Sequence, residues 1–232
     1  MLMANVRPGE YPLWGATYLR WWLYGKIMAL SPAGLLTGSP FLPPFLRLLG
    51  AKVGRNCHFA SGAISMPMFV EIEDDVSIGY GVQVLPYAVQ DGRLHIAPIH
   101  IGRDTFIGTN SIIEGGAKIG SGVAILEQSL VHADQVIPDN EAWGGSPIKR
   151  QETVRSLLTI LASTVDKRPW PFSILVGFFF GIIFVMLLPT LMVLPSVLLI
   201  SLVALRAGTD HAKGEARHLL SAHQLWLAQV DL

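Results

Sequence analysis

Two histidines in one irregular stretch are the residues best suited to chemistry in this sequence. His95 and His100 lie within residues 85–100, and Tyr87 and Asp91 occupy the same stretch. An unperturbed imidazole titrates near pH 6.5, which suits His95 to act as a general base. The alternative is a loop histidine whose ring only caps the neighbouring structure. His100 stands at a turn, where it can face the same cleft as His95.

A second group of candidate residues follows at residues 144–150, which read GGSPIKR. Gly144 and Gly145 allow close approach of the backbone to a thin ligand. Lys149 and Arg150 can pair with phosphate oxygens. The alternative is that GGSP is only an exit turn and that the basic pair faces lipid headgroups.

A six-residue repeat must position both groups. Aliphatic residues recur at every sixth position seven times, at Ile101, Ile107, Ile113, Ile119, Ile125, Val131 and Ile137. Neither a 3.6-residue helix nor two-residue strand alternation produces this period. A period of six predicts a solenoid of short strands, three hexads to a triangular coil, with the aliphatic residues stacked inside. A sandwich of short strands is the alternative, but its turns would be spaced irregularly and about 8–12 residues apart.

The repeat is expected to cover residues 51–150, with two irregularities. It begins at Val53, and one extra residue in the SMPMFV stretch shifts the register to Ile72. The 17 positions from Val84 to Ile101 break the period, which predicts a loop extruded from the coil. Function usually lies in such excursions from a regular scaffold.

The composition points to a protein that partly faces lipid. Hydrophobic residues make up 51% of the 232-residue chain and charged residues only 15%, which is too apolar for an average soluble domain. A formal net charge of zero argues against a nucleic-acid binder. Cys57 is the single cysteine, so no intrachain disulfide is possible, and its place in the hexad predicts a packed core thiol. The first residues lack the pattern of a signal peptide.

Residues 1–50 are expected to form an interfacial helical segment. Aromatic residues crowd into one helix-length piece together with Arg20 and Lys26, a mixture typical of a membrane interface. A helix that covers the end of the solenoid is the alternative.

The region after the coil divides into three expected parts. Residues 151–170 read as an amphipathic linker helix. Residues 171–207 contain no charge from Phe172 to Leu205, and Pro189 and Pro195 near the middle favour a transmembrane hairpin of two short spans. A single kinked helix remains the alternative. Basic residues at both ends place the β-helix on the cytoplasmic side of a bacterial inner membrane. Residues 208–232 form a polar tail.

The run PIHIGRDTFIGTNSIIEGGAKIG, followed by IPDNEAWGGSPIKR, resembles the hexapeptide-repeat acyltransferases. That resemblance implies a mainly β fold, a left-handed parallel β-helix. The segments YPLWGATYLRWWL, FLRLLGAKVGRN and WGGSPIKR resemble more closely the carboxy-terminal membrane modules of polylysine-synthetase-type nonribosomal peptide synthetases. This closer resemblance implies acyl transfer from a phosphopantetheine or coenzyme A thioester to an amine, without a metal.

The resemblance also implies roles for individual residues. The family's base is a histidine in the extruded loop, and that position falls at Tyr87 here, which leaves His95 as the candidate base. The pantetheine and phosphate contacts would come from Ser111, Gly116, Gly144, Gly145, Ser146, Lys149 and Arg150. The implied partners are an acyl or aminoacyl carrier domain, the lipid bilayer, and further coils in a homotrimer or tandem pseudo-trimer.

Two functions remain open on these residues. One is a membrane-anchored acyl or aminoacyl transferase. The other is an inactive β-helix module that orients active copies at the membrane, which Tyr87 in place of the expected base would favour.

Overall fold

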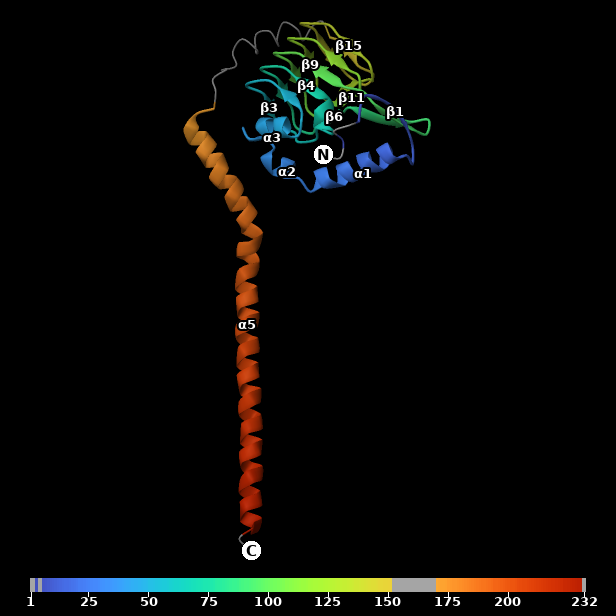
Figure 1. Ribbon diagram of the computed structural model, residues 1–232. Coiled ribbons are helices and arrows are strands. Elements are labelled where there is room, and N and C mark those ends of the chain that lie inside the picture. The colour runs from blue at the N-terminus through green and yellow to red at the C-terminus, as the bar shows by residue number, and fades with distance from the viewer. Residues whose placement is uncertain (1–2, 4–5, 152–169, 231–232) are drawn as a thin grey trace. The chain divides into compact units, whose positions relative to one another are not determined.

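The computed structural model describes residues 3, 6–151 and 170–230, with residues 207–230 as backbone only. The chain divides into two compact units, Met1–Val176 and Gly177–Leu232. The first unit holds a coil of short strands, a small antiparallel sheet and three helices, whereas the second continues one long helix (Figure 1).

Three walls of parallel strands form the coil, as the hexads predicted. The first wall contains β2 (Lys52–Val53), β4 (Val70–Ile72), β9 (Ile99–Ile101), β12 (Lys118–Ile119) and β15 (Val136–Ile137). The second contains β3 (His58–Phe59), β5 (Ser77–Ile78), β10 (Phe106–Ile107), β13 (Ala124–Ile125) and β16 (Ala142–Gly144), with β17 (Lys149–Arg150) antiparallel at its end. The third contains β6 (Gln83–Leu85), β11 (Ile112–Glu114) and β14 (Leu130–Val131).

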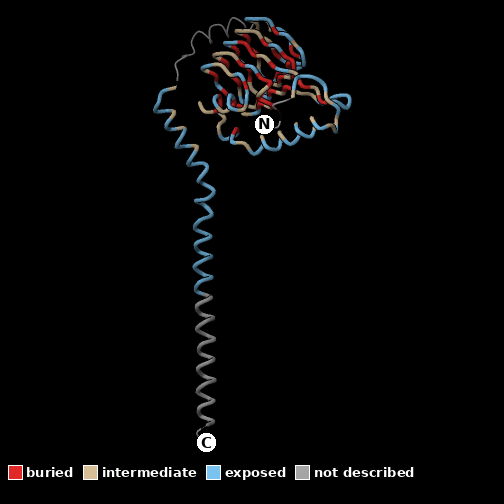
Figure 2. The backbone as a smooth tube through the Cα atoms, in the orientation of Figure 1, coloured by how far each residue is buried: buried red, intermediate tan, exposed pale blue. Residues whose placement is uncertain are grey.

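The strand register accounts for the repeat. Ile107 lies opposite Ile125 and Ile119 opposite Ile137, so consecutive coils are 18 residues apart. The aliphatic residue of each hexad is buried inside, and the residue before it points outward. Figure 2 shows the resulting stack of buried residues along the coil. The parallel β-helix predicted from the hexads is therefore confirmed.

Both predicted irregularities appear in the register. Val53 lies opposite Ile72, which is 19 positions away rather than 18. The extra residue falls where Met66, with a positive φ, begins the short 3₁₀ helix η1 (Pro67–Phe69). Ile72 lies opposite Ile101, 29 positions away, so the excursion adds 11 residues to one coil.

The excursion is a β-hairpin rather than an irregular loop. Strands β7 (Tyr87–Gln90) and β8 (Arg93–Ile96) pair antiparallel, and β1 (Gly9–Pro12) joins the other edge of β8. Asp91 and Gly92 form the turn, and both have positive φ, as a two-residue type I′ turn requires. The sequence predicted neither the hairpin nor the strand at residues 9–12.

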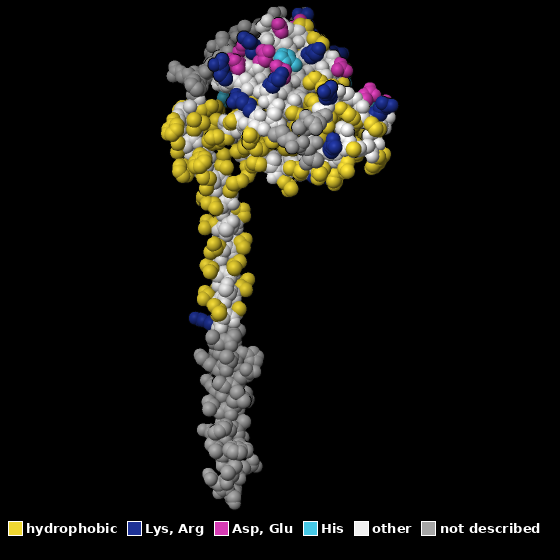
Figure 3. Space-filling model, viewed as in Figure 1, with side chains coloured by type: hydrophobic (Ala, Val, Ile, Leu, Met, Phe, Trp, Pro, Cys, Tyr) yellow, Lys and Arg dark blue, Asp and Glu magenta, His cyan; other side chains and the backbone are white. Residues whose placement is uncertain are grey.

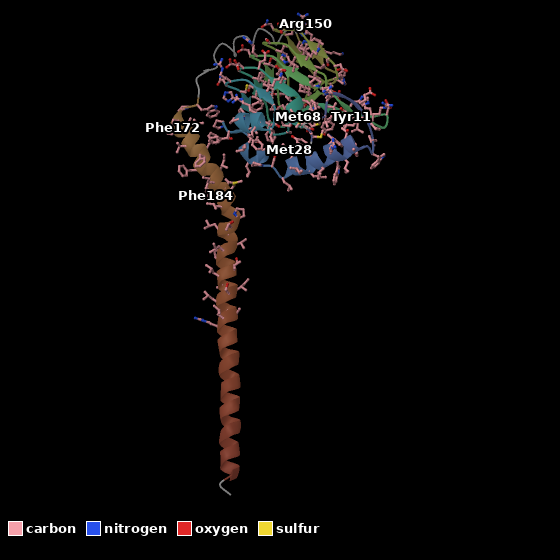
Figure 4. The ribbon with its side chains drawn as sticks, viewed as in Figure 1. Tyr11, Met28, Met68, Arg150, Phe172 and Phe184 are labelled. Atoms are coloured by element: carbon pink, nitrogen blue, oxygen red, sulfur yellow. The ribbon has the colours of Figure 1, made fainter. Side chains whose placement is uncertain are left out.

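Three helices follow β1, namely α1 (Ala16–Ala29), α2 (Ala33–Leu36) and α3 (Leu42–Leu48). Tyr18, Trp21 and Tyr24 on α1 pack against a second hydrophobic cluster, in which Leu94 and Ile96 of the hairpin are buried. Tyr11 and Met68 also pack there (Figure 4). Helix α1 therefore holds one face of the hairpin sheet.

The predicted transmembrane hairpin is wrong in this structure. Helix α5 runs without a break over Phe172–Val230, with Pro189 and Pro195 inside it. Each proline removes one backbone hydrogen bond and bends a helix, but the neighbouring bonds suffice to continue it. Its 35-residue portion Phe172–Arg206 is apolar and long enough to cross a membrane. The expected linker helix at 151–170 lies almost entirely outside the described residues.

The single cysteine offers a direct test of the coil. Cys57 is buried, and its thiol lies 3.1 Å from the Glu73 carbonyl oxygen. Burial raises the pKa of the Cys57 thiol, so little reactive thiolate forms near neutral pH. We expect iodoacetamide to modify Cys57 at least tenfold more slowly in the folded protein than in denaturant, as measured by mass spectrometry. Equal rates would show that this corner of the coil is open.

Candidate active site

The three-stranded sheet sorts its side chains onto two faces. Residues directly opposite each other on paired strands share a face. His95 lies opposite Ala88 and Glu10, whereas Tyr87 lies opposite Ile96. Successive residues alternate between the faces, so His95 and Tyr87 point to opposite sides of the sheet.

His95 is paired with a carboxylate from the distant strand β1. Its Nδ1 lies 3.5 Å from Oε1 of Glu10, and Arg93 Nη1 lies 3.3 Å from Oε2 of the same carboxylate. The other ring nitrogen, Nε2, is buried and has no hydrogen-bond partner among the described residues. The 3.5 Å separation is an ion-pair contact rather than a hydrogen bond. With the neutral ring protonated on Nδ1, which faces Glu10, the lone pair lies on Nε2, as in a carboxylate-oriented general base.

Glu10 is the site residue that sequence reasoning missed. The residues around it, RPGEYPL, show no strand alternation and contain two prolines. Its register partner lies 85 positions away in the sequence, so no local pattern joins the two. The Asp-Gly pair at residues 91 and 92 was an available signal for the hairpin that carries His95.

Two other candidates in the excursion have structural roles. The Tyr87 ring packs edge-on against Trp21, with the ring centroids 5.0 Å apart. Asp91 occupies the hairpin tip with φ 49°, in the turn itself. Neither residue lies on the face of the sheet that carries His95. Asp91 contributes to the turn that joins the two strands of the hairpin.

His100 lies on the outer face of the first coil wall. It stands between Glu71 and Lys118 in the register, and its Nε2 is 3.7 Å from Oε1 of Glu73. Arg103 also pairs with Glu73, at 3.4 Å. His100 thus belongs to a surface group of ionic contacts on the coil, separate from the pairing of His95 with Glu10.

Ser111 and Gly145 lie along one corner of the coil, joined through Ser129. Ser111 is fully buried, and its hydroxyl donates to the Leu126 carbonyl oxygen and accepts from the Ser129 N–H. The Ser129 hydroxyl accepts in turn from the Gly145 N–H at 3.1 Å. These bonds build the corner, and they leave the predicted contact of Ser111 with a pantetheine arm without support.

Two glycines are required by close approach. An added Cβ at Gly116, where φ is 85°, would collide with the Asp134 carboxylate. One at Gly144 would lie 2.8 Å from the Leu126 side chain. The Gly116 N–H donates to the Pro98 carbonyl oxygen, so this predicted contact residue lies where the chain returns from the hairpin into the coil.

The basic pair lies at the exit of the coil. Arg150 is 3.3 Å from Oε1 of Glu141, whose other oxygen accepts from the Trp143 indole. Lys149 is exposed and has no ion-pair partner within the described part of the chain. Ser146 is exposed too and precedes Pro147 through a cis peptide bond. Lys149 is therefore the basic residue at this end that has no ion-pair partner among the described residues.

Metal ligands are not grouped in the described residues, where no three His, Cys, Asp or Glu side chains are arranged to hold an ion. The chemistry that the pairing with Glu10 offers is proton transfer by the His95 imidazole, which requires that the buried Nε2 become accessible to a substrate. That chemistry suits an acyl acceptor that must lose a proton as it attacks.

The six-residue repeat of this chain also occurs in known proteins of similar sequence. Residues 98–133 match the family described as bacterial transferase hexapeptide (six repeats). The chain is 37% identical over 150 residues to the delta-poly-L-ornithine synthetase of Acinetobacter baumannii (strain AB307-0294), which covers 65% of this chain and 11% of the synthetase. It is 33% identical over 108 residues to YvoF of Bacillus subtilis (strain 168), provisionally assigned as an acetyltransferase, which covers 45% of this chain and 60% of YvoF.

A solved structure with the same repeat was also found. A hexapeptide-repeat containing acetyltransferase from Vibrio cholerae O1 biovar eltor, complexed with acetyl coenzyme A, is 24% identical, with a TM-score of 0.40 over 55% of this chain and 88% of that chain. The chain thus spans about a tenth of the synthetase and three fifths of YvoF. These similarities confirm the resemblance to the hexapeptide-repeat acyltransferases that the hexads and the GGSPIKR exit predicted.

Proposed function

We propose that this chain is an acyltransferase that forms an amide bond from a coenzyme A or carrier-bound phosphopantetheine thioester to an amine. The observation that carries the proposal is the pairing of His95 with Glu10, in which Nε2 of His95 has no hydrogen-bond partner among the described residues. The base removes a proton from the attacking amine nitrogen as the C–N bond forms. The thioester C–S bond then breaks, and the thiol leaves with a proton.

The donor would run along the coil toward its exit. Gly145 is exposed and carries no side chain that would block a thin arm, whereas Gly144 packs on Leu126; the exposed Lys149 can meet a phosphate. A single prism offers a cleft with one wall, so a second coil would supply the other wall in a homotrimer or a tandem pseudo-trimer. The similarity to a poly-ornithine synthetase supports an amino acid as the acceptor and a place beside a carrier domain in a nonribosomal peptide synthetase.

We place the coil at the cytoplasmic face of a bacterial inner membrane. The 35-residue, mostly apolar portion of α5 supports a membrane anchor, and exposed Trp14, Leu19 and Leu30 on or next to α1 support an interfacial surface. The free thiol of Cys57 is compatible with a reducing compartment.

The proposal is tested by assaying the full-length protein in nanodiscs for transfer from acetyl coenzyme A and from an aminoacyl carrier protein to L-ornithine. Turnover above the rate of the uncatalysed aminolysis supports an enzyme. No turnover with either donor would support the alternative, a scaffold module. That alternative has one observation in its favour, since Tyr87 at the expected base position is used in packing against Trp21.

The carboxylate partner gives a finer test of the site. Glu10→Gln keeps the size of the side chain but removes the charge that orients and stabilises a protonated His95 ring. We expect kcat to fall about tenfold, the effect of about 1.4 kcal/mol on the barrier, with KM for the acceptor unchanged. Glu10→Asp should retain more activity than Glu10→Gln. Equal kcat values for wild type and Glu10→Gln would show that Glu10 has no role in catalysis.

A further inference from the structure

A cavity of about 360 Å³ lies between helix α1 and the first coil. Trp21, Tyr24 and Met28 line it from α1, and Ile64 and Met66 line it from the coil. Met28 is labelled on the α1 side in Figure 4. Its size is within the range of small-molecule sites, and its walls are mostly apolar, as such sites usually are.

One hydrogen-bonding group in this apolar wall is unused. The Tyr24 hydroxyl is buried and has no partner among the described residues. Burial raises the pKa of Tyr24 to about 12, so the hydroxyl keeps its proton at neutral pH. A buried donor without an acceptor is unfavourable, and an oxygen of a bound molecule would satisfy it.

A positive charge stands at the exposed side of the same cavity. Lys26 lines it, and its Nζ lies 5.7 Å from the centre of the Trp22 ring. Lys26 has no carboxylate partner in the part of the chain that the structure describes. The cavity therefore combines a hydrocarbon-lined interior with a cation, which suits a molecule with an apolar chain and an anionic end.

The surroundings of the cavity provide such molecules. Leu19, Leu23 and Ile27 on the outer face of α1 are 63%, 40% and 49% exposed. Figure 3 shows hydrophobic side chains gathered over α1, whereas acidic and basic side chains are spread over the coil. Helices with this surface lie at the boundary of headgroups and acyl chains, so lipid tails would lie beside the opening.

The cavity does not serve the acyl group that reacts at His95. Tyr87 lines the cavity from the hairpin, and Tyr87 and His95 occupy opposite faces of that sheet. An acyl chain in the cavity is therefore separated from Nε2 of His95 by the sheet itself.

We propose that this cavity binds one acyl chain of an anionic glycerophospholipid, with the Tyr24 hydroxyl donating to an ester oxygen and Lys26 pairing with the phosphate. The lipid would fasten α1 to the coil and so hold the hairpin in place. This inference concerns binding only and stands whether or not His95 is catalytic.

The test titrates lauroyl-lysophosphatidylglycerol into the full chain in a fluorinated surfactant, which supplies no hydrocarbon chain of its own, with native mass spectrometry as the readout. We expect one lipid per chain. In a series of lysophosphatidylglycerols with acyl chains of eight to twelve carbons, the dissociation constant should fall about fourfold for each added methylene. Lauroyl-lysophosphatidylcholine, which carries a compensating positive charge, should bind at least fivefold more weakly.

Three variants and one control complete the test. Ala63→Trp fills the cavity from an exposed position and should weaken binding at least tenfold, and Tyr24→Phe about tenfold. Lys26→Gln should abolish the preference for phosphatidylglycerol while keeping the dependence on chain length. Leu23→Trp adds the same ring on the outer face of α1 and should stay within twofold of wild type. Far-UV circular dichroism checks that each variant folds.

Two results would overturn the proposal. Equal binding by wild type, Ala63→Trp and Tyr24→Phe would place the lipid elsewhere on the apolar surface. A change in oligomer mass caused by Ala63→Trp, with no lipid bound to wild type, would assign the cavity to a segment of a second copy.

Discussion

Replacing His95 by alanine is expected to lower kcat for acyl transfer by about 10²- to 10⁴-fold, the range that a general base contributes. The loss should fall on kcat, because the imidazole assists proton transfer in the transition state and contributes little to binding of the donor. Single-turnover measurements with acetyl coenzyme A and L-ornithine would separate the chemical step from binding.

The control for this variant is the other histidine. His100→Ala removes the same side chain from the outer wall of the coil, where it pairs with Glu73 and not with Glu10. We expect its kcat within about twofold of wild type, and the same for Tyr87→Phe. Full activity in His95→Ala, or a larger loss in His100→Ala, would move the base away from the hairpin.

The second large effect is on the free energy of unfolding, and two adjacent isoleucines in strand β11 allow it to be tested. Ile113 is fully buried between Val84 and Val131, whereas Ile112 points outward from the same strand. Ile113→Ala should lower the free energy of unfolding by about 2–5 kcal/mol, because the cavity it leaves in the stack cannot close. Strand β11 lies between β6 and β14, and each coil contacts only its neighbours, so the substitution weakens the packing of this coil on both of them.

Ile112→Ala is the matched control and should cost less than about 1 kcal/mol, since its side chain is half-exposed in the single chain. Urea denaturation followed by far-UV circular dichroism, with the protein in nanodiscs, measures both. Equal losses at the two positions would mean that Ile112 is as well packed as Ile113, which is the result expected of an assembly in which this wall is covered.

The coil could be predicted from the sequence because its information is local. The aliphatic residues from Ile101 to Ile137 recur at a fixed spacing of six, so each one predicts the position of the next. The structure stacks them in that register. The one-residue shift before Ile72 was readable for the same reason. The excursion before Ile101 could be located by its length, although its hairpin was recognisable only from the Asp-Gly turn.

Contacts between distant segments were not readable. Glu10 meets His95 through a strand whose sequence lacks alternation, and the packing of Tyr87 on Trp21 depends on how α1 lies against the hairpin. Ser111 shows a different limit, because a small polar residue at a corner has the same sequence signature whether it faces a ligand or the coil. In α5, the prolines indicated a turn, but an apolar segment can continue through them as a bent helix.

The pairing of β1 with β8 has a consequence for how the protein is made. Strands within the coil find partners 18–29 positions away, whereas Glu10 pairs with His95, 85 positions later. At roughly 5–20 residues per second a ribosome needs on the order of ten seconds to bridge that gap. Strand β1 is thus synthesised before its partner β8 and pairs with it late, so Glu10 comes to lie beside His95 only after the first strands of the coil have been made.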